Sequence, residues 1–487
     1  MILSVILIPV LAGALVFLIP FRKRSHMEVF LESMVILNSL LVWNLLLHRP
    51  DHIFTLANFT GNLSISFKVD GMGMVFGGLV STLWPLATLY AFEYMTKEEH
   101  EKVFFLFYTI TYGVTLGISF SANLLTMYFF YELLTLVTVP LVMHTLTREA
   151  ILASRKYLYY SLGGAAFAFI GLIFVIIYGN TTDFNLGGVL DPGRIGARTN
   201  VLLLIYVIAF MGFGVKAAIC PFNSWLPDAG VAPTPVTALL HAVAVVKSGA
   251  FAIIRLTYYS FGTDFLRGTW AQNVVMVIVM FTIVYGCSRA VKETHLKRRL
   301  AWSTVSNLSY ILFGVTIMTP LGMAAALSHL IFHAVMKISS FFCAGAVMHQ
   351  TQRSYVHEVD GLGYQMPFVF GVFTVSSLAL MGVPGLAGFV SKWNLASAAV
   401  ESGNGIAWAG IACLLISALL TAIYMLTIVI RAFFPGKDFD RETVKGITDP
   451  NWKMLVPLLI FSVSVLIFGL HSAPIVSFFK DVAAGMY

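Results

Sequence analysis

The chain has 487 residues, of which 58% are hydrophobic and only 11% are charged. Because a soluble domain carries roughly 25% charged residues, this composition excludes a soluble globular protein and indicates one that crosses a membrane many times. The net charge is +7, and the placement of the basic residues, described below, accounts for it without a nucleic-acid partner.

Fourteen apolar runs of roughly 18 residues or more follow one another, and each is long enough to span a bilayer as a helix. We therefore predict an all-α polytopic membrane protein with about fourteen transmembrane helices. The first run precedes Arg22, Lys23 and Arg24 instead of following basic residues, so we interpret it as a retained helix and not as a cleaved signal peptide. The runs are 2–20, 29–48, 71–95, 103–120, 124–145, 155–178, 201–222, 236–256, 271–288, 301–318, 323–347, 366–399, 407–430 and 454–472.

The basic residues between these runs are unevenly distributed. Alternate connections carry nineteen of the thirty Lys and Arg residues, the opposite connections carry seven, and four lie within apolar runs. Because short loops rich in Lys and Arg face the cytoplasm, we predict that residues 289–299 are cytoplasmic and that both termini lie outside. The net charge mostly reflects this topology.

Two apolar segments contain helix-breaking residues. The segment 216–240 carries four prolines, among them Pro221 and Pro227, and the run 366–399 is too long for one crossing and contains Pro384–Gly385. Proline removes a backbone donor and clashes with the preceding turn, and irregular backbone inside a membrane is tolerated only beside protein or a water-filled cavity. Two broken helices, one in each half and each near a buried lysine, are typical of inverted repeats in ion-coupled transporters.

Four lysines lie within these apolar segments, and their one clear acidic counterpart is Glu132 in the fifth run. A lysine at the bilayer centre costs about 2.5–3.5 kcal/mol, and one carboxylate cannot neutralise four ammonium groups. Some of these lysines must therefore be neutral part of the time, or contact water, which lets them take up and release protons. The four are Lys216, Lys247, Lys337 and Lys392.

Histidines accompany the lysines. His329, His333 and Lys337 are spaced four residues apart, so a helix places them on one stripe at intervals of about 6 Å. His241 precedes Lys247 in the eighth run. Because histidine changes its charge near neutral pH, we interpret these residues together as groups that pass protons.

Single members of this set also have structural explanations. An isolated histidine in a membrane helix is often a satisfied hydrogen bond between helices, and this alternative stays open for His241. A lysine near a helix end can snorkel to the interface, which would apply to Lys392. Histidines four apart can bind a metal or haem, but no matching pair lies on another helix, so no metal site is predicted. The four cysteines lie singly, without a Cys-x-x-Cys pair, which argues against zinc, iron–sulfur and disulfide frameworks; they are Cys220, Cys287, Cys343 and Cys413.

The stretch "PFNSWLPDAGVAPTPVTALLHA" resembles the motif of the antiporter-like membrane subunits shared by respiratory NADH:quinone oxidoreductase, Mrp cation/proton antiporters and membrane-bound energy-converting hydrogenases. Three further stretches resemble other signatures of that family, in the same order: "LKRRLAWSTVSNLSYILFG" (296–314), "HLIFHAVMKISSFFCAGAVMH" (329–349) and "GVPGLAGFVSKW" (382–393). The resemblance covers roughly residues 70–430.

This resemblance implies fourteen helices with two inverted five-helix repeats and a hydrophilic axis through the protein in the membrane plane. It divides the chain into N-terminal helices at 1–102, a first repeat at 103–256, a second repeat at 271–430 and a C-terminal helix within 431–487.

The resemblance also implies roles for the titratable groups. Glu132 and Lys216 would form a switchable ion pair, Lys247 and Lys337 would be lysines of the axis, and Lys392 would be the terminal charge on the second broken helix. The residues that would connect them are His241, His329 and His333.

The sequence departs from the family pattern in three places. Asn223 and Gly230 stand where many relatives have His, so we expect the cytoplasmic uptake of protons to differ. His295 stands where relatives usually have Asp before "LKR", which puts a contact at the start of that helix in doubt. Residues 473–487 are too short for the long lateral helix of the largest homologue in the NADH:quinone oxidoreductase, so we expect a different subunit.

We expect an ion-translocating subunit that works with other membrane subunits, including homologous antiporter-like ones, in a prokaryotic cytoplasmic membrane. It would move protons, alone or in exchange for Na⁺. No cofactor is predicted in this chain, because no residues here would hold a flavin, a cluster or nickel. The energy would be redox energy in a hydrogenase or NADH dehydrogenase complex, or an ion gradient in an Mrp antiporter. The retained Lys392 and the wording "APTPVTALLHA" favour the redox-driven group.

Two other classes remain as alternatives. A stand-alone solute carrier would gather hydrogen-bonding side chains in one substrate cavity, whereas the charges here are spread over five of the predicted helices. A structural membrane subunit would carry the same titratable groups without using them. Replacing the axis lysines separates this last alternative from ion transport.

Overall fold

The computed structural model describes residues 1–50, 52–60, 63–436 and 439–487. A helix lies at each of the fourteen apolar runs. In the first half of the chain these are α1 (Ile2–Leu18), α2 (Arg24–His48), α3 (Gly71–Tyr94), α4 (Glu101–Ser119), α5 (Leu124–Val142), α6 (Arg148–Tyr178), α8 (Thr199–Gly214) and the segment that contains α10 (Thr234–Ala238) and α11 (Val245–Ile254).

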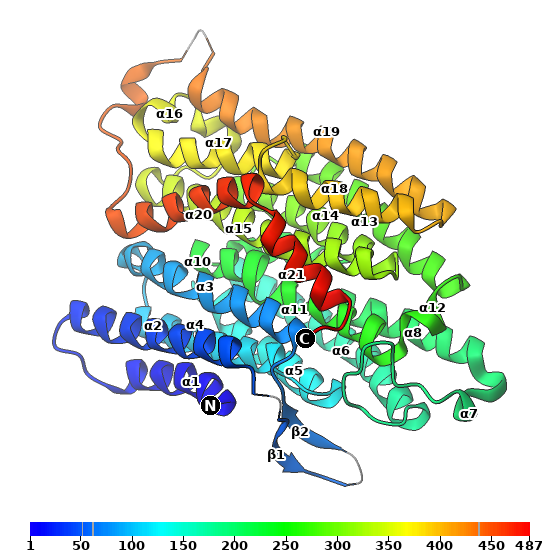
Figure 1. The fold of residues 1–487 in the computed structure, drawn as a ribbon. Coiled ribbons are helices and arrows are strands. Elements are labelled where there is room, and N and C mark those ends of the chain that lie inside the picture. Colours follow the sequence, from blue (N-terminus) through cyan, green and yellow to red (C-terminus); the bar gives the residue numbers. More distant parts are fainter. Residues whose placement is uncertain (51, 61–62, 437–438) are drawn as a thin grey trace.

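The second half continues with long helices of the same kind, namely α13 (Trp270–Lys292), α14 (Leu296–Thr316), α15 (Pro320–Thr351), α17 (Pro367–Met381), α18 (Ala387–Glu401), α19 (Gly405–Phe433) and α20 (Trp452–Leu470). Shorter helices are α7 (Pro192–Ile195), α9 (Trp225–Asp228), α12 (Thr263–Leu266), α16 (Leu362–Gln365) and α21 (Ala473–Ala483). Figure 1 shows α1, α2 and α4 on one side of the molecule and α16, α17 and α19 on the other, with α11 and α15 between them.

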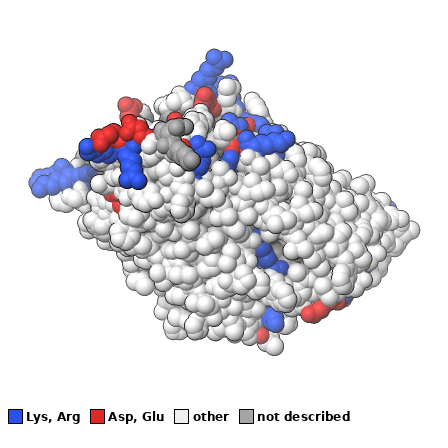
Figure 2. Space-filling view, turned by 90° about the horizontal axis from the view of Figure 1, so that it is seen from above, with Lys and Arg blue, Asp and Glu red and all other residues white. Residues whose placement is uncertain are grey.

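The surface of the molecule suits a bilayer. Eleven helices among the described residues are long and apolar enough to cross a membrane. Large apolar side chains such as Leu47, Leu419 and Leu470 are exposed. On the face drawn in Figure 2, most charged residues gather along one edge and leave a wide area without charge. The chain is an integral multi-pass membrane protein, and the number of fourteen crossings stays a prediction.

Two spans form the centre of the molecule. In α15 and in the segment Thr234–Phe261, every residue of the most apolar stretch is buried inside the protein, whereas in spans such as α2, α6 and α20 less than half is buried. Helices that are apolar all round belong in the interior of a large assembly of helices. These two central spans are also the ones that carry the predicted axis lysines and histidines.

A small β-hairpin corrects the all-α prediction. Strands β1 (Phe54–Asn58) and β2 (Ser64–Phe67) pair in antiparallel fashion, with Phe54 opposite Phe67. The hairpin is attached to the start of α5, where the Ser66 backbone N–H donates to Thr126 Oγ1 at 2.9 Å. Runs of four and five residues are too short to stand out from loop sequence beside apolar runs four times as long.

The first break lies where the prolines predict it, but the preceding helix ends earlier than expected. The apolar run predicts a helix over 201–222, whereas α8 ends at Gly214. The chain then turns irregularly past Pro221 to α9, which contains Pro227, and resumes as α10. The irregular backbone is buried among other helices, as required inside a membrane.

The eighth run is not one regular helix. Between α10 and the end of this span, the backbone forms two π-helical segments, Leu239–Val243 and Arg255–Phe261, on either side of α11. Such segments are rare and frequently occur at functional sites. His241 lies in the first of them and Arg255 begins the second.

The second break lies at Pro384–Gly385, as predicted. Helix α17 ends with Gly382 at φ +95°, Gly385 follows at φ +86°, and α18 starts two residues later. The two arms approach so closely that a Cβ on Gly388 would lie 1.8 Å from the Ala379 carbonyl oxygen.

This close approach predicts the effect of a single methyl group. Gly388→Ala should destabilise the protein by about 1–3 kcal/mol, because the overpacked arms must separate. The measurement is the thermal unfolding midpoint of the detergent-solubilised protein. The matched control is Gly371→Ala in α17, where an added Cβ meets no atom within 4 Å. Equal midpoints for the two variants would contradict the packing argument.

Candidate functional site

A line of buried polar side chains crosses the centre of the molecule. Lys247 on α11 lies with its Nζ 2.6 Å from Nδ1 of His333 on α15. The ring of His333 stacks on that of His329 at 5.7 Å between centroids. His329 Nδ1 in turn lies 2.9 Å from Ser391 Oγ on α18. Lys247 and both histidines are fully buried, so this line joins the central span of the first half to the second broken helix.

Lys337 points in another direction. Its Nζ donates to Ser303 Oγ on α14 at 2.7 Å. Ser303 Oγ also accepts a hydrogen bond from the Tyr424 hydroxyl on α19 at 2.7 Å. The predicted stripe of His329, His333 and Lys337 therefore serves two polar connections, one toward α18 and one toward α14 and α19.

Lys392 binds the second break. Its Nζ donates to the carbonyl oxygens of Leu380 and Met381, at 2.6 and 3.0 Å. These are carbonyls at the C-terminal end of α17, where the helix dipole favours a cation. The ammonium also lies 5.3 Å from the centre of the Tyr310 ring. The snorkelling alternative is wrong for this residue, because its ammonium turns toward the broken backbone.

Glu132 and Lys216 are not paired in this structure. The Lys216 ammonium donates to the Tyr131 carbonyl and lies 3.4 Å from the centre of the Tyr131 ring. Within the described residues, no ion pair within 4.0 Å joins it to Glu132, and one Glu132 carboxylate oxygen is buried without a hydrogen-bond partner. The two groups are nevertheless neighbours of the same residue. The ion pair implied by the resemblance stays a prediction, and this structure holds it open.

His241 has no hydrogen bond that would explain it structurally. It is fully buried on the π-helical segment Leu239–Val243, and neither ring nitrogen has a partner among the described residues. Its ring lies 4.8 Å from that of Phe341 on α15. The alternative of a satisfied hydrogen bond between helices is therefore wrong. A buried histidine without partners calls for water or a transient proton.

The described residues contain no group of three or more His, Cys, Asp and Glu side chains that could hold a metal ion. His295 is the residue before α14 and makes no capping hydrogen bond through its side chain. Burial lowers its pKa to about 4. The contact that Asp would make at this helix start is thus not replaced by His295.

One buried charge is missed by sequence reasoning. The charge distribution places Arg255 in an outer connection, but its side chain is fully buried and bonds to both carboxylate oxygens of Asp70, at 2.6 and 2.7 Å. The rings of Phe184 and Tyr259 lie within 5 Å of the guanidinium. The residue lies at the end of an apolar run, where a helix end and a loop look alike in sequence, and no local signal identifies its partner 185 positions earlier.

The fold and these buried groups define an integral membrane protein with a polar interior built on two broken helices. The sequence belongs to the NADH:quinone oxidoreductase/Mrp antiporter transmembrane family, whose profile matches residues 121–421. This confirms the family resemblance. NADH-quinone oxidoreductase subunit N of Desulforudis audaxviator is 31% identical over 416 residues, which cover 82% of this chain and 80% of that protein. A Na(+)/H(+) antiporter protein of Alkalihalophilus pseudofirmus is 30% identical over 437 residues, 84% of this chain and 53% of that protein.

Solved structures share the fold. A chain of the archaeal membrane-bound sulfane sulfur reductase superposes with a TM-score of 0.85 at 21% identity, covering 99% of this chain and 97% of that one. A chain of the Mrp complex from Dietzia sp. gives a TM-score of 0.84 at 21% identity, covering 100% and 97%. Both belong to larger membrane assemblies, so other membrane subunits are the partners of proteins with this fold.

Proposed function

We propose that the chain is a proton-translocating, antiporter-like subunit of a redox-driven membrane complex of the energy-converting hydrogenase or NADH dehydrogenase type. The contact line Lys247–His333–His329–Ser391 carries this proposal. A proton can move along it only by hopping between titratable groups and water, and every titratable group in the line is buried. Relatives in redox complexes and in ion antiporters support an ion-translocating subunit.

The architecture of the proposal extends this line to both halves. Fourteen crossings would comprise N-terminal helices at 1–102, a first repeat at 103–256, an inverted second repeat at 271–430 and a last helix within 431–487. Each repeat would contribute one broken helix, at Pro221–Pro227 and at Pro384–Gly385. Inversion is supported by the opposite directions that the charge distribution assigns to these two helices.

The proposed residue roles follow the positions in the fold. Glu132 and Lys216 form the switch, Lys247 and Lys337 are the lysines of the axis, and Lys392 is its terminal charge. The groups that connect them are His241, His329 and His333. The distribution of Lys and Arg supports a cytoplasmic 289–299 connection and both termini outside, in a prokaryotic cytoplasmic membrane. The partners are other membrane subunits, the lipid bilayer and protons, with Na⁺ exchange as a variant.

A component of an Mrp-type Na⁺/H⁺ antiporter is the second candidate, supported by the antiporter relatives. The two candidates differ in the neighbouring chains, so purification of the intact complex and identification of its subunits separates them. A redox protein among the neighbours would establish the first candidate. A stand-alone solute carrier requires the chain to be active without any neighbour.

The switch predicts the effect of removing one charge. Glu132→Gln should slow proton translocation at least about tenfold and change its pH dependence, because no mobile negative charge then remains to hold and release the proton of Lys216. The measurement is proton uptake by vesicles that contain the purified complex. The control is Glu149→Gln, an exposed residue at the start of α6. A rate and a pH profile equal to those of the unchanged protein would disprove the switch.

A further inference from the structure

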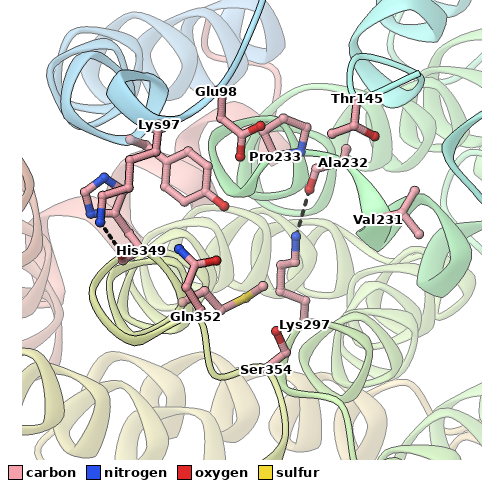
Figure 3. A pocket seen from close by; sticks show the side chains of 12 residues that line it. Lys97, Glu98, Thr145, Val231, Ala232, Pro233, Lys297, His349, Gln352 and Ser354 are labelled. Carbon is pink, nitrogen blue, oxygen red and sulfur yellow. Dashed lines mark hydrogen bonds between the residues drawn. The ribbon is translucent and has the colours of Figure 1, made fainter. Parts of the chain in front are cut away.

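A second polar region lies at one end of the molecule, away from the central line. It is a cavity of about 220 Å³ between the ends of α3 and α15 and the start of α14, closed on another side by the first broken helix. Figure 3 shows its lining, in which Glu98 and Lys297 approach the same space from opposite walls. The polar side chains that matter here are Tyr94, Lys97, Glu98, Lys297, His349 and Gln352. This end of the molecule carries the 289–299 connection, which we place in the cytoplasm.

The cavity contains both engaged and unengaged polar groups. Lys297 Nζ donates to the Ala232 carbonyl at 2.8 Å, and Lys97 Nζ donates to the His349 carbonyl at 2.5 Å. The His349 side chain is only 7% exposed, yet neither of its ring nitrogens has a partner among the described residues. A buried polar group needs a hydrogen bond, and this cavity is large enough to supply several waters.

Polar groups lead from the cavity toward the central line. The Ala232 carbonyl that accepts from Lys297 also accepts from Thr237 Oγ1, at 3.0 Å. His241 follows Thr237 by four residues, so it lies about one turn further along the same side of the helix. Its two unpartnered nitrogens are thus the next polar atoms on this path. Lys247 lies six residues beyond His241 on the same span and begins the central line.

We propose that this cavity is a water-filled vestibule through which protons, and not sodium ions, pass from the cytoplasm to His241. The inference rests on the proposed function and names both the ion and its route. The vestibule residues are Lys97, Glu98, Lys297 and His349, and His241 receives the proton from them through water beside Thr237.

Charge and ligand supply exclude sodium from this vestibule. Hard cations require several oxygen ligands, and two carbonyl oxygens at the cavity, those of Ala232 and His349, already accept from lysines. Two ammonium groups face one carboxylate, so a metal cation meets net repulsion at close range. A proton needs only water and a group that exchanges it.

The titration of the vestibule residues supports proton exchange. Burial raises the pKa of Glu98, against the opposing effect of Lys297. Burial lowers the pKa of Lys297, which precedes the apolar span 301–318, to about 8, against the opposing effect of Glu98. Both groups therefore change charge closer to neutral pH than they would in water. The other titratable groups that face them are Tyr94, Lys97 and His349.

The test uses the purified complex in vesicles, with proton uptake followed by a pH-sensitive dye at several pH values and Na⁺ concentrations. Glu98→Gln and, separately, His349→Leu should each slow proton uptake about tenfold, because each removes a group that exchanges protons with vestibule water. The matched control is Glu99→Gln, the exposed neighbour of Glu98, which should leave uptake unchanged. Lys297→Met should make uptake sensitive to Na⁺, whereas the unchanged protein should be insensitive to it.

The outcomes separate this inference from the proposed function. If Lys247→Met stops uptake while Glu98→Gln and His349→Leu both behave like Glu99→Gln, the vestibule is wrong and the central line stands. If Lys247→Met has no effect, the proposed function fails. Uptake that requires Na⁺ in the unchanged protein would overturn the exclusion of sodium. His349→Leu removes no hydrogen bond between protein groups through its ring, so the test does not depend on Glu98→Gln assembling.

Discussion

Lys247→Met should reduce proton translocation by about 100-fold or more, the contribution of a well-placed proton-transfer group. The ammonium lies 2.6 Å from His333 Nδ1, and methionine matches the volume of lysine but carries no exchangeable proton. The line through His333 and His329 would then lose its contact with the first half of the chain. The measurement is dye-monitored proton uptake by vesicles containing the complex, normalised to the amount of assembled complex.

The same variant should leave assembly and stability intact. Replacing a buried ionisable group with an apolar one of similar size is often neutral or stabilising, so the unfolding midpoint should not fall. Lys445→Met is the control, because Lys445 is 74% exposed in a loop and contacts only Glu442. Normal translocation by Lys247→Met would mean that the buried groups are structural. A loss of translocation together with a lower unfolding midpoint would point to misfolding, and His333→Leu would then repeat the test on the partner side.

Asp70→Asn should have the largest effect on stability, a loss of about 3 kcal/mol. Arg255 is fully buried and Asp70 provides both of its carboxylate contacts, so the variant leaves a buried guanidinium without a counter-charge. Asparagine can still accept the hydrogen bond from Gly73 N–H that caps α3, which isolates the effect of the charge. The measurement is the unfolding midpoint of the solubilised protein in detergent.

The ion pair also predicts an asymmetry between its partners. Arg255→Met should cost only about 1 kcal/mol, because the Asp70 side chain is 13% exposed and keeps its bond to Gly73 N–H. Methionine would instead fill the space among the rings of Phe184 and Tyr259. Asp264→Asn, at an exposed acidic residue of α12, should have no effect. Equal losses for Asp70→Asn and Arg255→Met would show that the pair does not act through the desolvated guanidinium.

The sequence alone was sufficient for the membrane fold, the breaks and the family. Apolar runs and prolines act through local rules, since a hydrocarbon environment requires a long apolar helix and a proline interrupts its hydrogen bonds wherever it lies. The residues Lys247, Lys337 and Lys392 were identifiable for the same reason, because a charge inside an apolar run is anomalous whatever its partner. Gly382 and Gly385 likewise mark the second break in the sequence before any contact is known.

What only the tertiary structure decided is which groups meet. The spacing of His329, His333 and Lys337 predicted one stripe, but the directions of their contacts depend on α11, α14 and α18, which approach from different sides. The open state of Glu132 and Lys216, the burial of Arg255 and the vestibule around Glu98 and Lys297 also arise between segments far apart in the chain. The physical reason is that helix formation in a membrane depends on local composition, whereas the partner of a buried charge depends on which helices pack together.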